Sequence, residues 1–316
     1  MKYHDLANGD RMPLLGLGTW KAAPGEVGAA VSTALELGYR HLDCAAIYGN
    51  EAEIGEALRR AFDAGTVSRD DLWVTSKLWC NRHREEEVED GLRTTLEALG
   101  LEYLDLYLVH WPVAVRHDVV GPSSAEDFLT LDEVPLEETW AGMTACLELG
   151  LTRHIGVSNY NLARLRDHAA LSVAPEVNQV ELHPYLQQRE LVEGARELGI
   201  LSTAYSPLGS MDRPDTMKGE DEPVLLHDAE VAAVAAELDA SPAQVLIAWA
   251  MGRGTAVIPK SVHPGRLAEN LAAADLRLTG AQMERLGALD RSFRFVTGTF
   301  WERAGGPYPA AELWGE

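Results

Sequence analysis

Cysteine is scarce in this sequence. Its 316 residues include three cysteines, Cys44, Cys80 and Cys146, which lie far apart in the chain. An odd number of widely separated cysteines does not match a disulfide framework, and their spacing does not match a zinc site. We therefore expect no structural disulfide and no metal site.

Positive charge is also scarce. Lys and Arg number 27 against 49 Asp and Glu, so the formal net charge is -22. A chain this acidic is unsuited to binding nucleic acid or an anionic lipid surface. An anionic ligand would need a local pocket of cations within this acidic field. Lysine is the rarer cation and occurs only as Lys2, Lys21, Lys77, Lys218 and Lys260.

Long apolar runs are absent. No stretch of about 18 apolar residues occurs, so no membrane span is expected. Met1-Lys2 is followed by polar residues rather than by an apolar signal segment. The sequence predicts a cytoplasmic protein, and we expect no obligate protein partner.

The sequence does contain a repeated alternation of short apolar runs and helical patterns. Short apolar runs are typical of a parallel sheet that is buried on both faces. Alternation at this spacing predicts helices packed outside such a sheet. The eight expected strands are 14–18, 39–43, 71–77, 103–110, 153–158, 176–180, 200–205 and 256–258.

Eight repeats in a chain of this length favour a closed (β/α)8 TIM barrel that forms one domain over 1–316. An open dinucleotide-binding sheet would carry G-x-G-x-x-G after its first strand, and 16–21 has only two of these glycines. Asn8-Gly9 predicts an N-terminal β-hairpin over 2–12. Ten helical patterns are present, two more than eight repeats require. Long loops are expected over the C-terminal face at 113–134, 210–226 and 291–316, the last covering the pocket.

Polar residues stand where the apolar strands end. Asp43, Lys77 and His110 end the second, third and fourth strands, and Tyr48 lies in the loop beyond Asp43. Each residue alone has an ordinary structural explanation, such as a solvated charge, a buried histidine or a helix cap. In a barrel of this kind, however, catalytic groups come from the C-terminal ends of several strands. Their joint placement therefore predicts an active site.

These residue types suit the reduction of a carbonyl group. At about 4 Å and an effective dielectric of 20, a lysine cation favours a phenolate by about 4 kcal/mol. We therefore expect Lys77 to lower the pKa of Tyr48 and make it a proton donor nearer neutral pH. Asp43 would orient Lys77, and His110 would polarise the substrate oxygen. The hydride would have to come from a cofactor.

Four ordered motifs resemble the aldo-keto reductase superfamily, and in particular its aldose and aldehyde reductase branch. The first is Asp43-x-Ala45-x-x-Tyr48-Gly49-Asn50-Glu51, and the second is the histidine segment 104–112. The third combines 156–160 with 177–184. The fourth is 258–261 followed by Arg266, Glu269 and Asn270. The resemblance covers nearly the whole chain and implies the same eightfold barrel.

The resemblance implies NADPH as the cofactor and a catalytic tetrad of Asp43, Tyr48, Lys77 and His110, with Tyr48 as the general acid. Lys260 and Arg266 would favour NADPH over NADH, because an adenosine 2′-phosphate needs local cations. The residues implied to contact the cofactor are Thr19, Trp20, Asp43, Ser158, Asn159, Gln179, Tyr205, Ser206, Leu208, Ser210, Lys260, Ser261, Arg266, Glu269 and Asn270.

Aromatic residues near the tetrad suggest the substrate pocket. Trp20, Trp79 and Trp111 each follow a strand end, and they resemble the aromatic walls of the same branch. Phe300 and Trp301 from the tail are expected to complete the pocket. Such walls suit apolar or aromatic aldehydes and exclude water.

The expected function is the NADPH-dependent reduction of aldehydes to alcohols, with ketones or sugars as further carbonyl substrates. Two alternatives remain open at this point. One is a lyase that forms a Schiff base on Lys77 or Lys260, which would require an unpaired lysine. The other is a non-catalytic subunit that binds NADPH and senses redox state.

Overall fold

Eight parallel strands close on themselves into a barrel. The computed structural model describes residues 2–219 and 221–315. The strands occur in the spatial order β12-β11-β10-β9-β6-β5-β4-β3. Parallel bridges from Leu15 to Val257 and from Gly18 to Lys260 join the two edges, so the expected TIM barrel is confirmed. The strands are β3 (Leu17–Gly18), β4 (His41–Asp43), β5 (Trp73–Leu78), β6 (Leu104–Val109), β9 (Thr152–Ser158), β10 (Val177–Glu181), β11 (Leu201–Tyr205) and β12 (Ala256–Val257).

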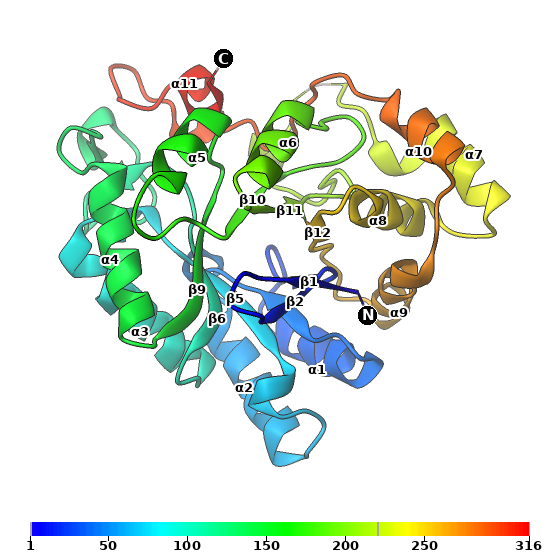
Figure 1. Cartoon of the computed structure of the whole chain (residues 1–316), viewed down its shortest axis with the longest axis horizontal. Coiled ribbons are helices and arrows are strands. Elements are labelled where there is room, and N and C mark those ends of the chain that lie inside the picture. Colours follow the sequence, from blue (N-terminus) through cyan, green and yellow to red (C-terminus); the bar gives the residue numbers. More distant parts are fainter. Residues whose placement is uncertain (1, 220, 316) are drawn as a thin grey trace.

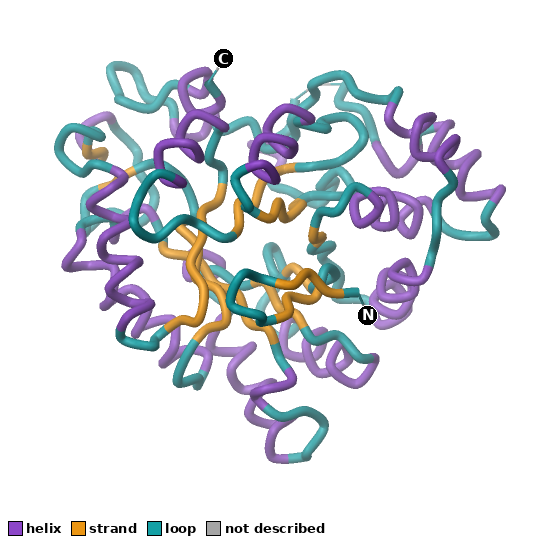
Figure 2. The backbone as a smooth tube through the Cα atoms, viewed as in Figure 1, coloured by secondary structure: helices purple, strands orange, loops and turns teal. Residues whose placement is uncertain are grey.

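The helices surround the barrel, as Figures 1 and 2 show. Local capping explains several boundaries. At the start of α8, the Ser241 hydroxyl accepts from the Gln244 N–H and Pro242 occupies the first helical position. The larger helices are α1 (Val27–Leu37), α2 (Glu51–Asp63), α3 (Glu85–Leu99), α4 (Leu136–Glu148), α5 (Leu162–Ala169), α6 (Arg189–Glu197), α7 (Ala229–Glu237), α8 (Pro242–Gly252), α9 (Pro264–Ala272) and α10 (Gly280–Gly287).

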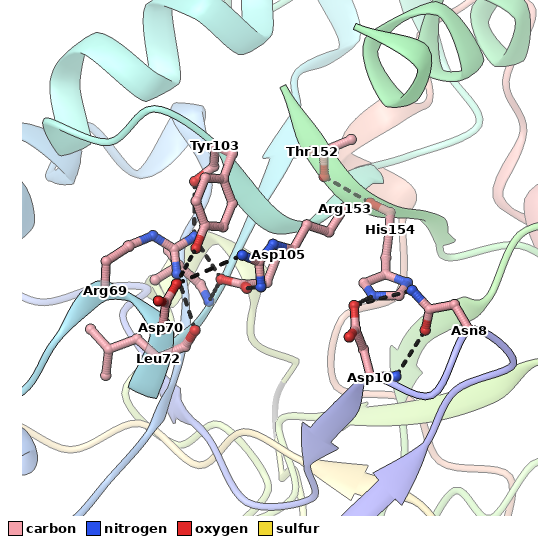
Figure 3. A network of polar contacts seen from close by, with 11 residues as sticks. Asn8, Asp10, Arg69, Asp70, Leu72, Tyr103, Asp105, Thr152, Arg153 and His154 are labelled. Atoms are coloured by element: carbon pink, nitrogen blue, oxygen red, sulfur yellow. Dashed lines mark hydrogen bonds and ion pairs between the residues drawn. The ribbon is translucent and has the colours of Figure 1, made fainter. Parts of the chain in front are cut away.

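The predicted N-terminal hairpin covers the end of the barrel at which the strands begin (Figure 1). It pairs β1 (Tyr3–Asp5) with β2 (Arg11–Pro13). Its buried Leu6 and Met12 pack with Trp73 and Val177, which begin β5 and β10. In Figure 3, the His154 ring meets Asp10 from the hairpin, with Nε2 3.0 Å from Oδ2. Apolar packing and this polar contact therefore hold the hairpin in place.

The long segments at the other end have more structure than the sequence suggested. Segment 113–134 contains an antiparallel pair, β7 (Ala114–Val115) and β8 (Phe128–Leu129). The tail contains the 3-10 turn η8 (Thr299–Trp301) and a short helix, α11 (Ala310–Trp314). Tyr308 joins the two segments, because its hydroxyl donates to Leu129 O at 2.6 Å and accepts from Ala114 N at 3.0 Å.

The helices of residues 2–219 and 221–315 are short or polar compared with membrane-spanning helices. None of the single helices described there is both long and apolar enough to cross a membrane. Only α7 and α8 taken together reach those limits, and they are bent by 89° relative to each other.

Candidate active site

The four predicted tetrad residues meet at the C-terminal end of the barrel. Asp43 ends β4, Lys77 lies near the end of β5, and His110 directly follows β6. Tyr48 ends η1 (Ala46–Tyr48), the short turn that follows β4. Because these strands are neighbours in the barrel, residues distant in sequence converge at one site. Lys77 Nζ lies 2.6 Å from Asp43 Oδ1 and 3.4 Å from the Tyr48 hydroxyl.

Lys77 is a fully buried cation. Its ammonium donates to Asp43 and also to the Cys44 carbonyl at 2.7 Å. Burial lowers the pKa of Lys77, but the charge and the hydrogen bond of Asp43, together with smaller effects of its other neighbours, outweigh burial, and the pKa of Lys77 is raised. Lys77 therefore remains charged and fixed beside the phenol.

The expected lowering of the Tyr48 pKa is wrong in this structure. Burial raises the pKa of Tyr48 to about 12, although Lys77 acts in the opposite direction. The coulombic argument from sequence omitted the cost of placing a phenolate in a buried site. Tyr48 is therefore a protonated phenol across the physiological pH range, which is the form that can donate a proton.

His110 faces Tyr48 as a neutral imidazole. Burial and the Lys77 cation hold the pKa of His110 well below its usual value. The ring packs edge-on against Tyr48 at 5.8 Å between centroids and against Trp79 at 5.3 Å. Its Nδ1 is buried and has no hydrogen-bond partner among the residues described, so Nε2 is the ring nitrogen that could meet a ligand in the cavity. His110 can thus offer a hydrogen bond to a substrate oxygen without carrying charge.

One cavity of about 760 Å³ opens onto this site. Lys77 lies beneath its surface, and Trp301 packs behind its wall. The other predicted site residues all line it, namely Thr19, Trp20, Asp43, Tyr48, Trp79, His110, Trp111, Ser158, Asn159, Gln179, Tyr205, Ser206, Leu208, Ser210, Lys260, Ser261, Arg266, Glu269, Asn270 and Phe300.

Amide side chains connect the tetrad to the next part of the cavity. Gln179 Nε2 donates to Asp43 Oδ2 at 2.6 Å, so the carboxylate is held from both sides. Asn159 has a positive φ of 63° and accepts from the Tyr205 hydroxyl at 2.9 Å. Ser158 donates to the Gln179 carbonyl at 2.7 Å. These contacts fix the orientation of amides and a phenol along one wall.

Asp212 was not predicted as a site residue, yet it joins two cavity-lining lysines. Its carboxylate lies 2.6 Å from Lys21 Nζ and 3.3 Å from Lys260 Nζ. Lys21 also donates to Ser210 Oγ at 2.8 Å. The loop after β11 is therefore tied to the loops after β3 and β12. The position of Lys21 directly after Trp20, in a chain with few lysines, was the available signal in the sequence.

The far end of the cavity offers donors and cations. Arg266 is exposed and forms no ion pair with any residue in the described ranges. Ser261 Oγ accepts from the His263 N–H at 3.1 Å. Glu269 accepts from the Ser241 hydroxyl, and Asn270 is buried beside it. A donor set of lysine, arginine and serine suits a phosphate group.

The aromatic end of the cavity lies on the other side of the barrel mouth. Trp111 follows β6 and Lys260 follows β12, and these strands are four apart in either direction around the barrel. Phe300 packs edge-on against Trp111 at 5.3 Å, and Trp301 packs against Trp79 at 5.6 Å. Ile47 and Val296 line the cavity too, and no motif in the sequence indicated them.

Neither Lys77 nor Lys260, the two candidate nucleophiles, has the environment that a Schiff-base mechanism requires. Lys77 is buried and paired with Asp43, and its pKa is raised rather than lowered. Lys260 is paired with Asp212. A nucleophilic amine would need an unpaired lysine with a depressed pKa. Among the residues described, no group of His, Cys, Asp and Glu is arranged to hold a metal ion.

The chain is similar to known proteins in both sequence and structure. The model of the aldo/keto reductase family matches residues 14–291. An aldo/keto reductase of Synechocystis sp. is 53% identical over 317 residues, covering 100% of this chain and 97% of that protein. The human aldo-keto reductase family 1 member A1 is 47% identical, covering 92% of this chain and 90% of that protein. The structure of the aldose reductase from Schistosoma japonicum superposes with a TM-score of 0.85 at 40% identity, covering 95% of this chain and 96% of that one.

Proposed function

The chain belongs to the aldo/keto reductase family, and we propose that it reduces aldehydes to alcohols with NADPH, using Tyr48 as the proton donor. The observation that carries this proposal is the buried Lys77 cation, placed 2.6 Å from Asp43 and 3.4 Å from the Tyr48 hydroxyl. A phenol, a neutral histidine and a cavity form one site in which Lys77 and Lys260 are both paired with carboxylates. Ketones and sugars are proposed as further carbonyl substrates.

The chain's own residues would manage the proton and the developing charge. NADPH, when bound, would supply the hydride. Tyr48 would donate its proton to the substrate oxygen, and the adjacent Lys77 cation would stabilise the phenolate left behind. The neutral His110 would donate a hydrogen bond to the same oxygen and hold it within reach of Tyr48. Asp43 would keep Lys77 in place, and Gln179 would keep Asp43 in place.

The cavity offers donor chemistry that suits the proposed cofactor. Ser158, Asn159 and Gln179 present amide and hydroxyl groups suited to the nicotinamide amide, and Tyr205 presents a ring beside them. Lys260, Ser261 and Arg266 are suited to the 2′-phosphate, which favours NADPH over NADH. The remaining cofactor contacts are proposed at Thr19, Trp20, Asp43, Ser206, Leu208, Ser210, Glu269 and Asn270.

The proposed substrates are uncharged apolar or aromatic aldehydes. The tryptophans Trp20, Trp79 and Trp111 line the substrate end together with Phe300, while Trp301 supports them from behind. Lys260 and Arg266 stand on the opposite side of the barrel mouth from Trp111 and Phe300, and Lys21, whose Nζ lies 4.3 Å from the centroid of the Trp20 ring, is paired with Asp212. An aromatic ring would bury apolar surface against these walls, whereas a carboxylate would be desolvated there without a partner.

We also propose that the whole chain acts as one domain and as a monomer in the cytoplasm. The three cysteines are all free and buried, which suits a reducing compartment. The tail, 291–316, would close the substrate pocket. The complete tetrad argues against a purely sensing role, because a protein that only binds NADPH would not need a proton donor.

The cofactor assignment is tested with Arg266→Met. We expect the kcat/KM for NADPH to fall about tenfold or more, because a charge-assisted contact to phosphate is lost. The value for NADH should barely change. Arg59→Met is the matched control, since Arg59 is an exposed arginine on α2 that pairs with Asp63. Equal losses for NADPH and NADH would contradict the assignment, and absence of aldehyde turnover with either cofactor would contradict the proposed reaction.

A further inference from the structure

Glu181 is a fully buried carboxylate at the end of β10 that no step of the proposed reaction uses. Its side chain is 0% exposed. Oε1 accepts from the Phe295 N–H at 2.7 Å and lies 2.8 Å from His183 Nε2. Oε2 accepts from the Val296 N–H at 2.8 Å. Both carboxylate oxygens are therefore engaged, and two of the three partners are backbone groups of the C-terminal tail.

The surroundings favour the ionised form of this carboxylate. Burial alone would raise the pKa of Glu181, but His183 and the two backbone N–H groups outweigh burial and lower it. A buried charge is tolerated only where hydrogen bonds replace its lost hydration. The tail supplies those hydrogen bonds, so the charge and the position of the tail depend on each other.

The backbone that Glu181 holds leads directly into the substrate wall. Val296 itself lines the cavity, and Phe300 lines it four residues later. The far end of the tail has its own attachment, because Arg164 Nη1 donates to the Leu313 carbonyl at 2.7 Å. The tail that forms the pocket is therefore held by Glu181 at its start, by the Tyr308 contacts with segment 113–134 further along, and by Arg164 at its far end. Of these attachments, the one at Glu181 is the nearest in sequence to Val296 and Phe300, the tail residues that line the cavity.

Glu181 also connects the two walls of the cavity. It lies two residues after Gln179 on the same strand, and its backbone pairs with Tyr205 on β11. Gln179 and Tyr205 line the part of the cavity proposed for the nicotinamide. Strand β10 thus carries both Gln179, which is proposed to contact the cofactor, and Glu181, which binds the tail that lines the substrate pocket.

We propose that Glu181 is a positioning residue for substrate specificity, holding Val296 and Phe300 where they form the wall of the substrate pocket. The inference rests on the proposed reductase function. His183 assists by orienting the carboxylate, and its ring packs on Phe295 with centroids 5.0 Å apart. Aldehydes large enough to reach the tail depend on this anchor, whereas small aldehydes that contact only the tetrad do not.

The test is Glu181→Gln, which keeps the size of the side chain but replaces one acceptor oxygen with a donor. That donor would face a tail N–H, so one anchor contact is lost. The KM for an aromatic aldehyde such as naphthaldehyde should rise about tenfold, while the KM for propanal and the Kd for NADPH change less than about twofold. Glu181→Asp keeps the charge and should recover part of the lost affinity for naphthaldehyde.

Glu176→Gln is the matched control. Glu176 precedes the same strand and also bonds a histidine, since its Oε2 lies 2.7 Å from His154 Nδ1, but it lies at the opposite end of the barrel. In this variant, the KM for naphthaldehyde should not rise relative to the KM for propanal. A general loss of folded enzyme would lower kcat for both aldehydes and leave both KM values unchanged. The inference would be overturned if Glu181→Gln lowered kcat for both aldehydes with unchanged KM values. It would also be overturned if Glu176→Gln raised the KM for naphthaldehyde as much as Glu181→Gln does.

Hydrogen exchange at the Phe295 and Val296 amides separates this inference from the proposed reaction. In Glu181→Gln, exchange should be about tenfold faster at whichever of the two amides loses its acceptor oxygen, whereas in Glu176→Gln exchange should be unchanged at both. Unchanged exchange in Glu181→Gln would overturn the anchor even if the enzyme is an active reductase. Failure of the natural chain to turn over either aldehyde would instead overturn the proposed reaction.

Discussion

Lys77 and Asp43 form an ion pair in which Nζ lies 2.6 Å from Oδ1 and neither side chain is more than 2% exposed. The pair is further satisfied by the Cys44 carbonyl on the lysine and by Gln179 on the carboxylate. Replacing one partner of a buried pair leaves the other charge without compensation. Lys77 therefore links the stability of the barrel end to the electrostatics of Tyr48.

Lys77→Met should reduce both stability and activity. We expect a loss of about 3–5 kcal/mol in the free energy of unfolding, because Asp43 stays buried without its cation. Turnover of the remaining folded enzyme should fall about a hundredfold, since the phenolate of Tyr48 loses its stabilising charge. Urea denaturation and steady-state kinetics measure the two effects. Lys218→Met is the control, because Lys218 pairs with an exposed aspartate; equal stability of the two variants would contradict the account.

Asp212→Asn should weaken the ion pairs by which Asp212 connects Lys21 and Lys260. In the natural chain, Asp212 joins Lys21 and Lys260, and Lys21 also contacts Ser210, one of the residues proposed to contact the cofactor. Cofactor exchange would require these ion pairs to open, so we expect NADPH to dissociate about tenfold faster from the variant. Stopped-flow fluorescence measures the rate. Asp215→Asn, in the same loop but on the exposed Lys218 pair, should leave the rate unchanged, and equal rates in both variants would rule out this role of the ion pairs.

Much of the site could be predicted from sequence because barrel geometry determines where strand ends converge. Asp43, Lys77 and His110 end neighbouring strands, so their convergence needs no loop conformation. The prediction that the pKa of Tyr48 is lowered was wrong because burial depends on packing that a local sequence pattern does not show. Asp212 was missed because its partners come from the loops after β3 and β12. The tail wall at Val296 depends on a contact with Glu181 across more than a hundred residues of chain.

The charge of the substrate should affect turnover strongly. Lys260 and Arg266 lie across the barrel mouth from Trp111 and Phe300, and Lys21 beside Trp20 is already paired with Asp212, so a carboxylate on the substrate would be desolvated without a free cation to pair with. We expect kcat/KM for 4-carboxybenzaldehyde to be about tenfold or more below that for 4-nitrobenzaldehyde. High salt would screen repulsion by the net charge but not this desolvation. If the difference in kcat/KM between the two aldehydes disappeared in high salt, repulsion by the surface charge, and not desolvation in the pocket, would be its cause.

The contact between His154 and the hairpin should make stability depend on pH. Burial lowers the pKa of His154, but hydrogen bonds and charge from Glu176 and Asp10 outweigh it, and the net pKa is raised above 6.5. A raised folded-state pKa gives a stabilising contribution that is complete below pH 6.5 and is lost as pH rises through the folded pKa. The gap in unfolding free energy between the natural chain and His154→Gln should therefore be larger at about pH 6 than at about pH 9. A constant gap in urea denaturation would contradict a protonated His154 between two carboxylates.

The role of Tyr48 is the central claim, and one comparison tests it most directly. NADPH oxidation with 4-nitrobenzaldehyde is measured for the natural chain and for Tyr48→Phe, with NADPH binding measured on both. The account predicts turnover by the natural chain, a loss of about a hundredfold or more in kcat for Tyr48→Phe, and similar NADPH affinity. Equal turnover by the two proteins would contradict it, because the proton would then come from another group.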